Sequence, residues 1–381
     1  MKIGILKERR AAEKRCAATP ETVKKYIALG AEVVVEAGAG IAASILDAAF
    51  EAAGAKIAPD AAATVAGADI VLKVQRPMHA AEGNDELGKL AKGTTLIAIL
   101  NPYGAKESLA AYAGAGIDAM AMELVPRITR AQSMDVLSSQ ANLAGYKAVI
   151  DAAAEYNRAF PMMMTAAGTV APARVLVMGA GVAGLQAIAT ARRLGAIVSA
   201  TDVRPASKEQ VASLGATFVA VEDEEFKQAE TAAGYAKPMS EAYQAKQAAL
   251  IAETIKKQDI VITTALIPGR KAPVLVTEEM VKSMKPGSVI VDLAVEQGGN
   301  CPLTELGQVV EKFGVKLVGH ANVPSRLAAD ATALYAKNLL NFVTLLIDKE
   351  SKQLKVNWED EIVKGVALTK GGQVIHPNFQ A

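Results

Sequence analysis

The stretch RVLVMGAGVAG, at residues 174–184, decides the fold of this chain. Its apolar run 175–177 predicts a buried strand, and the alanine-rich segment that follows predicts a helix. Between them, glycines recur at the GxGxxG spacing as Gly179, Gly181 and Gly184. Such glycines permit a tight turn, a close approach of the backbone to a pyrophosphate, and close packing of helix on strand, while the helix N-terminus offers amide donors to phosphate. Strand, turn and helix together predict a dinucleotide-binding site of the Rossmann type.

An acidic residue at the end of the next strand supports this prediction. The run 197–202 predicts a strand that Asp202 closes, 18 residues after Gly184 and near the spacing of about 20 at which a carboxylate holds ribose hydroxyls. A carboxylate there repels a 2′-phosphate, which favours NAD(H) over NADP(H). Arg204 leaves another interpretation open, because an arginine beside the ribose can bind a 2′-phosphate or stack on adenine. We give Asp202 the greater weight because it occupies the strand end.

The rest of the chain alternates β-branched runs with longer segments rich in alanine, leucine and charged residues. This rhythm is typical of α/β proteins with parallel sheets. One series begins with the strand 2–6 and a second begins at Arg174. The segment 138–158 predicts a long helix that bridges the two series, with a domain boundary near 160–164. A second long helix is expected over 326–347.

Near the C-terminus the sequence predicts a hairpin, in which the strands 362–368 and 373–375 flank Lys370-Gly371-Gly372. The predicted fold class is therefore α/β, with two Rossmann-like parallel-sheet domains joined by long helices and a C-terminal β-hairpin.

Composition excludes several classes of function. The 41 Lys and Arg balance 40 Asp and Glu, so no global field attracts nucleic acid or an anionic membrane. The longest stretch without a charged residue has 17 residues and is interrupted by glycines, whereas a membrane span needs about 20 apolar residues. The N-terminus lacks the apolar run of a signal peptide, so we expect a cytoplasmic chain. The two cysteines and three histidines are scattered, and no metal site is expected.

Two further segments are candidates for function. The segment 122–135 is the most polar loop of the first series, at the expected cleft between domains, where ligand sites tend to occur; surface loops are also often polar, so both interpretations stay open. The segment 232–240 contains an aromatic residue and a methionine and is either a mobile functional loop or a linker.

Four runs carry a resemblance to a known family: MELVPRITRAQSMD (122–135), FPMMMTAAGT (160–169), GAGVAGLQ (179–186) and VDLAVEQGGNC (291–301). Together they resemble the NAD(H)-binding component of proton-translocating NAD(P) transhydrogenase. The resemblance covers essentially the whole chain. It implies a first domain of residues 1–137 completed by 327–381, of the alanine dehydrogenase N-terminal type, and an NAD(H)-binding domain of residues 138–326.

The resemblance also implies an activity and partners. NADH bound to this chain would exchange hydride with NADP+ bound to a separate beta subunit, coupled to proton translocation by a transmembrane subunit. The chain would form a homodimer, associate with the inner face of the cytoplasmic membrane through its partners, and neither bind nucleic acid nor insert into the membrane itself.

Site residues follow from the resemblance position by position. Those placed around the nicotinamide and its ribose, with a catalytic role, are Arg127, Gln132, Asp135 and Ser138, with Ile128 and Thr129 as further cofactor contacts. Gln132 can donate to and accept from neutral groups, while Arg127 and Asp135 can pair and hold the loop. The other cofactor contacts are Gly179, Gly181, Val182, Gly184, Asp202, Val203, Arg204, Gly234, Tyr235, Met239, Gln247 and Leu266. Hydride transfer between two nicotinamides needs ring positioning in a dry site and no acid or base.

Two alternatives remain. An alanine dehydrogenase-like amino acid oxidoreductase would share the opening KIGILKE, Arg15, Lys73 and the cofactor domain. That family has a histidine after the strand equivalent to 94–100, and here the run continues Asn101-Pro102-Tyr103. The other alternative is an NAD-sensing subunit without chemistry of its own.

Overall fold

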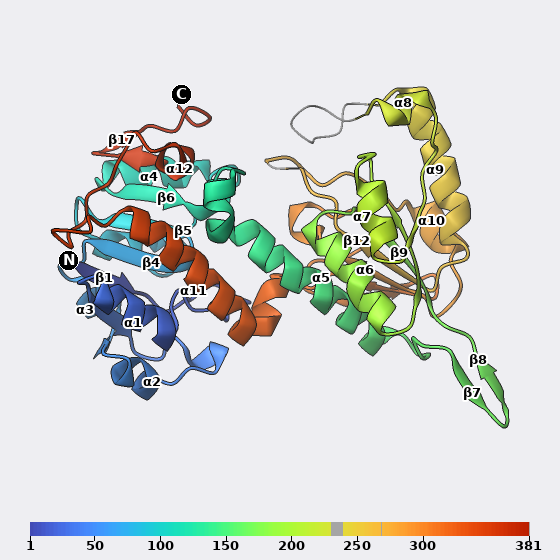
Figure 1. Ribbon diagram of the computed structural model, residues 1–381, viewed down its shortest axis with the longest axis horizontal. Coiled ribbons are helices and arrows are strands. Elements are labelled where there is room, and N and C mark those ends of the chain that lie inside the picture. Colours follow the sequence, from blue (N-terminus) through green and yellow to red (C-terminus); the bar gives the residue numbers. More distant parts are fainter. Residues whose placement is uncertain (230–238, 268, 381) are drawn as a thin grey trace. The chain divides into compact units, whose positions relative to one another are not determined.

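The computed structural model describes residues 1–229, 239–267 and 269–380. The chain divides into two compact units: residues 1–140 with 324–381 form unit 1, and residues 141–323 form unit 2. The long helix α5 (Val136–Glu155) passes from the first unit into the second. Each unit is built around its own parallel sheet (Figure 1).

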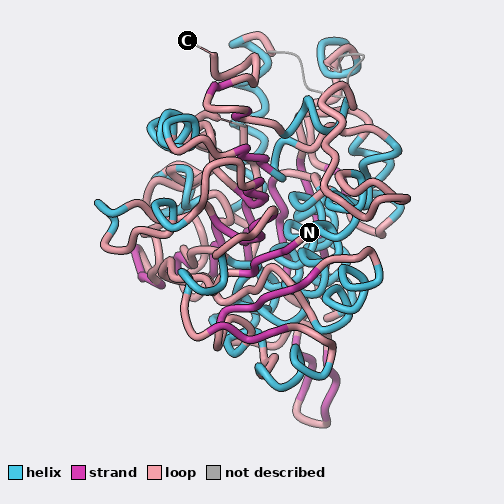
Figure 2. Tube along the Cα trace, turned by 90° about the vertical axis from the view of Figure 1, so that its left-hand side faces the viewer, coloured by secondary structure: helices cyan, strands magenta, loops and turns pink. Residues whose placement is uncertain are grey.

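Unit 1 contains a six-stranded parallel sheet in the order β3-β2-β1-β4-β5-β6. Figure 2 looks onto this unit, with its strands in magenta. The strands are β1 (Lys2–Ile5), β2 (Glu32–Glu36), β3 (Lys56–Ala58), β4 (Ile70–Gln75), β5 (Thr95–Ile99) and β6 (Asp118–Ala121). The helices of unit 1 are α1 (Pro20–Ala28), α2 (Asp47–Ala52), α3 (Ala61–Val65), α4 (Lys106–Gly114), α11 (Ala328–Leu345) and α12 (Glu361–Val366).

Helices cover both faces of this sheet because the strands are apolar on both sides. Ile3 and Ile5 of β1 pack with α1 and α11, whereas Val71 of β4 and Leu96 of β5 pack with α3 and α4. Strands buried on both faces are typical of parallel sheets. The helix α11 therefore belongs to the core of unit 1, although the whole of unit 2 separates it from β6 in the sequence.

The C-terminal segment closes the β6 edge of the same sheet. Backbone hydrogen bonds join Leu368 to Ala119, and the hydroxyl of Thr369 donates to the carbonyl oxygen of Ile117. The expected hairpin is present but short, with β16 (Thr369–Lys370) paired to β17 (Gln373–Val374).

The predicted strand at 362–368 is wrong. Residues Glu361–Val366 form α12, because the side chain of Asp360 caps the helix by accepting from the backbone N–H of Ile362 at 2.8 Å. The buried residues Ile362, Val363 and Val366 follow a helical period, so β-branched side chains here line one helix face.

Unit 2 contains a seven-stranded sheet in the order β11-β10-β9-β12-β13-β15-β14, parallel except for β14. The strands are β9 (Arg174–Met178), β10 (Ile197–Thr201), β11 (Thr217–Phe218), β12 (Ile260–Thr263), β13 (Val289–Asp292), β14 (Val309–Lys312) and β15 (Val315–Val318). The helices are α6 (Val182–Arg193), α7 (Ser207–Ser213), α8 (Glu224–Lys227), α9 (Glu241–Ile255) and α10 (Glu278–Ser283). Val175 and Val177 of β9 pack with α5 and α6, whereas Leu176 and Met178 pack with α9 and α10.

A two-stranded hairpin of β7 (Met163–Thr165) and β8 (Gly168–Val170) extends from unit 2 (Figure 1). The sequence indicated only a break in the pattern at this place. Met162, Met163 and Met164 are 58%, 43% and 78% exposed, so the hairpin presents apolar side chains to its surroundings.

Candidate functional site

The glycine turn after β9 has the geometry that its sequence predicts. Gly179 has φ +104°, a conformation that favours glycine, and a Cβ added to Gly184 would lie 1.8 Å from the carbonyl oxygen of Gly179. At Gly181, the residue before α6, an added Cβ would meet nothing within 4 Å. The turn is therefore closed where α6 packs on β9 and open where a phosphate would approach the first amides of α6. These residues fit a dinucleotide.

Asp202 follows the neighbouring strand β10, and four N–H groups hold its carboxylate. Oδ1 accepts from the backbone N–H of Arg204 at 2.8 Å and from its Nε at 2.9 Å. Oδ2 accepts from the backbone N–H of Ala180 at 2.7 Å and from Nη2 of Arg204 at 3.0 Å. Burial opposes ionisation of Asp202, but the hydrogen bonds from Arg204 and Ala180 outweigh it and lower the pKa of this carboxyl. Asp202 is thus an ionised carboxylate fixed against the glycine turn.

The segment after β12 completes the set of strand ends. The order β10-β9-β12 places Asp202, the glycine turn and Leu266 after the carboxyl ends of three adjacent parallel strands, where doubly wound sheets bind ligands. Val182, Val203 and Leu266 are 41%, 57% and 47% exposed and offer apolar surface there.

Gln247 of α9 has its amide bonded within the protein. Its Oε1 accepts from the backbone N–H of Val221 at 2.8 Å, and its Nε2 donates to Oγ1 of Thr201 at 3.1 Å. These bonds tie α9 to the end of β10. Met239, just before α9, is half-buried, while Gly234 and Tyr235 lie outside the described residues.

The polar loop of unit 1 leads from β6 to the start of α5. Arg127 and Gln132 are exposed, and Gln132 lies in the 3₁₀ turn η5 (Thr129–Met134) with Thr129, next to Ile128. Asp135 accepts from the backbone N–H of Ser138 at 2.9 Å and from its Oγ at 2.5 Å, so the carboxylate caps the start of α5. The expected pairing of Arg127 with Asp135 is not found among the described residues, because Asp135 is engaged by Ser138.

Sequence reasoning missed the residues that hold these two regions in place. In unit 1, the side-chain amides of Asn338 and Asn341 on α11 donate to the carbonyl oxygen of Ser133, and Arg130 forms a bidentate ion pair with Asp360. In unit 2, the buried Asn300 bonds both the N–H and the carbonyl oxygen of Ala265, next to Leu266. Asn300 stands in the run 291–301 that carried some of the resemblance, which was the available signal.

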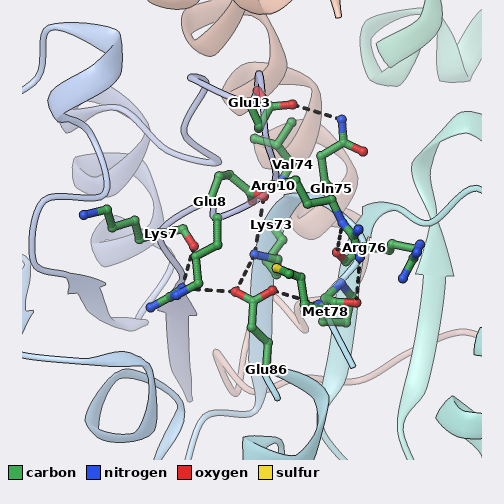
Figure 3. A network of polar contacts seen from close by, with 12 residues as sticks. Lys7, Glu8, Arg10, Glu13, Lys73, Val74, Gln75, Arg76, Met78 and Glu86 are labelled. Carbon is green, nitrogen blue, oxygen red and sulfur yellow. Dashed lines mark hydrogen bonds and ion pairs between the residues drawn. The ribbon is translucent and has the colours of Figure 1, made fainter. Parts of the chain in front are cut away.

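A network of buried charges lies at the carboxyl ends of β1 and β4 in unit 1 (Figure 3). Nζ of Lys73 lies 3.0 Å from Oε1 of Glu86 and 3.4 Å from Oε2 of Glu8. Arg15 donates from Nε and Nη2 to the two carboxylate oxygens of Glu13, at 2.8 Å and 2.6 Å. Lys73 and Arg15 are 1% and 4% exposed, so both cations are neutralised within the protein.

Comparison with known proteins places the chain in a family. Residues 4–144 match the family model described as "Alanine dehydrogenase/PNT, N-terminal domain", and residues 148–377 match "Alanine dehydrogenase/PNT, C-terminal domain". The chain is 62% identical over 377 residues to the first of the separately encoded pieces of the NAD(P) transhydrogenase subunit alpha of Rhodospirillum rubrum, covering 99% of this chain and 98% of that one. The chain therefore belongs to the alanine dehydrogenase/PNT family, in the branch of the transhydrogenase alpha subunits. The family identified from the four sequence runs is confirmed, as is the α/β fold class with two Rossmann-like domains.

Solved structures agree. A crystal structure of transhydrogenase from Sinorhizobium meliloti matches with a TM-score of 0.89 and 59% identity, covering 98% of this chain and 100% of that one. An L-alanine dehydrogenase structure matches with a TM-score of 0.82 and 26% identity, covering 100% and 98%. None of the described helices is long and apolar enough to cross a membrane.

Proposed function

We propose that this chain is the NAD(H)-binding component of a proton-translocating NAD(P) transhydrogenase. It holds NADH while hydride passes to NADP+ on a separate beta subunit, and a transmembrane subunit couples the exchange to proton movement. The observation that carries the proposal is the strand-end geometry of unit 2, where the open glycine turn and the ionised Asp202 meet at adjacent strands, in a chain of the transhydrogenase branch.

The residues of unit 2 have distinct roles in this proposal. The first amides of α6 receive the pyrophosphate next to Gly181, and Asp202 accepts from the ribose hydroxyls. Val182, Val203 and Leu266 supply apolar contacts, and Gln247 keeps the end of β10 in register with α9. Gly234, Tyr235 and Met239 are proposed to contact the nucleotide from the segment before α9.

The loop of unit 1 is proposed to position the nicotinamide and its ribose. Bound NADH supplies the hydride, so the protein's task is to hold the ring and exclude water. Gln132 is exposed and offers both a donor and an acceptor to neutral groups, and Arg127 offers an exposed cation. The bonds between Asp135 and Ser138 fix the start of α5, which gives the loop a rigid base.

The charge network of unit 1 argues against an amino acid oxidoreductase. A substrate carboxylate would have to displace Glu13 from Arg15, or Glu86 and Glu8 from Lys73, in a region that is almost fully buried. After β5, the backbone N–H of Asn101 donates to Glu123, at the place where a histidine would be needed as acid and base.

The proposed assembly includes a second copy of the chain. The β7–β8 hairpin is a two-stranded sheet with exposed methionines, and a hairpin of two strands is marginally stable by itself. A homodimer in which each hairpin packs on the other copy accounts for this surface. Sedimentation of the chain should give a dimer, and Met163→Ser with Met164→Ser should shift it toward monomer. The dimer would reach the inner face of the cytoplasmic membrane through the partner subunits.

Reconstitution tests the function. The purified chain with NADH is mixed with the NADP(H)-binding component carrying thio-NADP+, whose reduced form absorbs at longer wavelength than NADH. We expect reduced thio-NADP to appear only when both components are present. Tight NADH binding and a stable complex without any hydride exchange would instead identify a sensing subunit.

A further inference from the structure

We propose that Arg204 is a 2′-phosphate-binding group held closed by Asp202, so that the site rejects NADP(H) because its phosphate receptor is occupied. This inference rests on the proposed function, since it concerns the nucleotide selectivity of the same site. It assigns the selectivity to one ion pair and to a competition within it. The sequence alone suggested simple repulsion by a carboxylate.

The ion pair has little room for another partner. Nε and Nη2 of Arg204 are both directed to Asp202, at 2.9 Å from Oδ1 and 3.0 Å from Oδ2. Each oxygen also accepts one backbone N–H, so the carboxylate receives four donors in all. A carboxylate has about four lone-pair sites, so these donors saturate it. The side chain of Asp202 is 7% exposed and that of Arg204 is 32% exposed, so the arginine is the group that a ligand reaches.

The charges near this strand end cancel. Arg204 neutralises Asp202, and on the neighbouring helix α7 the exposed Lys208 is paired with Glu222. Repulsion of a phosphate by Asp202 is therefore offset by the guanidinium beside it. A fork of two parallel N–H donors is the arrangement that binds carboxylate and phosphate equally well.

The two nucleotides break this ion pair in different ways. Ribose hydroxyls are donors, so NADH takes acceptor positions on Asp202 and lets Arg204 turn aside. A 2′-phosphate has only acceptors to offer at physiological pH, so NADPH must take the fork of Arg204. It then leaves the buried Asp202 without its partner and next to a dianion. The same ion pair thus admits one nucleotide and excludes the other.

Four variants test this inference by fluorescence titration with NADH and NADPH. Asp202→Asn releases the fork while keeping the shape of the side chain, and we expect NADPH to bind about tenfold tighter and NADH about tenfold weaker. In the double variant Asp202→Asn with Arg204→Leu, the gain for NADPH should disappear. Arg204→Leu alone should bind NADPH no better than the parent chain. Glu222→Gln is the matched control, because it changes the net charge equally without releasing the fork, and should change neither affinity more than about twofold.

Each outcome has a defined meaning. A gain for NADPH that survives in the double variant, or an equal gain in Glu222→Gln, would overturn the inference in favour of simple repulsion. No gain in Asp202→Asn, checked with Asp202→Ser and with thermal unfolding to show that both fold, would also overturn it. A parent chain that binds neither nucleotide would instead overturn the proposed function, which keeps the two failures distinct. Displacement of bound NADPH by 2′,5′-ADP, and not by 5′-AMP, should follow the same order among the variants.

Discussion

The hydroxyl of Thr264 donates a 3.1 Å hydrogen bond to the carbonyl oxygen of Gly179, which ties the end of β12 to the turn after β9. The same carbonyl oxygen is the atom that a Cβ at Gly184 would meet at 1.8 Å. One backbone group therefore receives a bond from the neighbouring strand and allows α6 to approach closely. The nucleotide turn is held by contacts within unit 2.

Gly184→Ala should disrupt this turn. The added Cβ cannot be accommodated without moving α6 away from β9, so we expect a loss of about 1–3 kcal/mol in the free energy of unfolding and at least tenfold weaker NADH binding. Gly181→Ala is the matched control, since its Cβ meets no protein atom. It should keep the stability and still weaken NADH binding, because the Cβ enters the space of the phosphate. Urea unfolding followed by circular dichroism, with NADH titration, separates the two effects; equal stability losses in both variants would contradict this account.

Asn300→Ala should release the segment that carries Leu266. The side chain of Asn300 makes three hydrogen bonds, to Ala265 and Pro273, and the residue is fully buried. Leaving these backbone groups unsatisfied costs about 2–4 kcal/mol, and NADH affinity should fall with it. The exposed Asn378 is the control, and Asn378→Ala should change neither quantity. NADH affinity that stays at the parent value would show that Leu266 plays no role in binding.

Much of unit 2 could be predicted because its signals are local. The strand before the glycine turn, the helix after it and Asp202 at the next strand end are all close together in the sequence, and the bounds of β9 agree with those expected. The ion pair between Asp202 and Arg204 could not be read from their proximity in the chain. An arginine two residues from a carboxylate can turn toward it or toward a ligand, and only the folded geometry decides.

The misses depend on contacts distant in sequence. Asn338 bonds Ser133, which is 205 residues away in the chain, and no pattern within either segment reports this contact. The run Ile362, Val363 and Val366 has strand-forming side chains, but the cap from Asp360 and burial along one face make it helical. The hairpin β7–β8 was missed because consecutive methionines follow neither the period of a helix nor that of an amphipathic strand.

Gln132→Asn should slow hydride transfer far more than it weakens NADH binding. The shortened side chain keeps its amide but withdraws it from the ring, and a shift of about 1 Å in positioning costs on the order of a hundredfold in rate. We expect such a loss in the rate of thio-NADP reduction with the partner component, with at most a few-fold change in NADH affinity. Gln353→Asn, at an exposed position, is the control. A fall in rate no larger than the fall in affinity would contradict the positioning role.

The acid stability of unit 1 should depend on Glu13. Burial opposes its ionisation, but the hydrogen bonds and charge of Arg15 outweigh burial and lower its pKa to about 2 from 4.5. Because the folded-state pKa is depressed, the ion pair stabilises the protein fully above about pH 5, and this contribution is lost as the pH falls toward 2. Glu13→Gln should cost about 3–5 kcal/mol at pH 7, since Arg15 loses its carboxylate partner, and about 2 kcal/mol less at pH 3.

The fluorescence of Trp358, the single tryptophan of the chain, reports unfolding of unit 1 in urea at each pH. Replacing the partner, with Arg15→Met, should remove most of the same pH dependence. If Glu13→Gln loses the same free energy at pH 7 and pH 3, Arg15 does not lower the pKa of Glu13 in the folded protein.

The most direct test of the central claim is a titration of the purified chain with NADH and with NADPH, followed in the same cuvette by pyruvate and ammonium. We predict that NADH binds, that NADPH binds much more weakly, and that NADH is not consumed until the NADP+-loaded partner component is added. Steady oxidation of NADH by pyruvate and ammonium, without any partner, would show that the chain is an amino acid dehydrogenase with an acid and base still to be found.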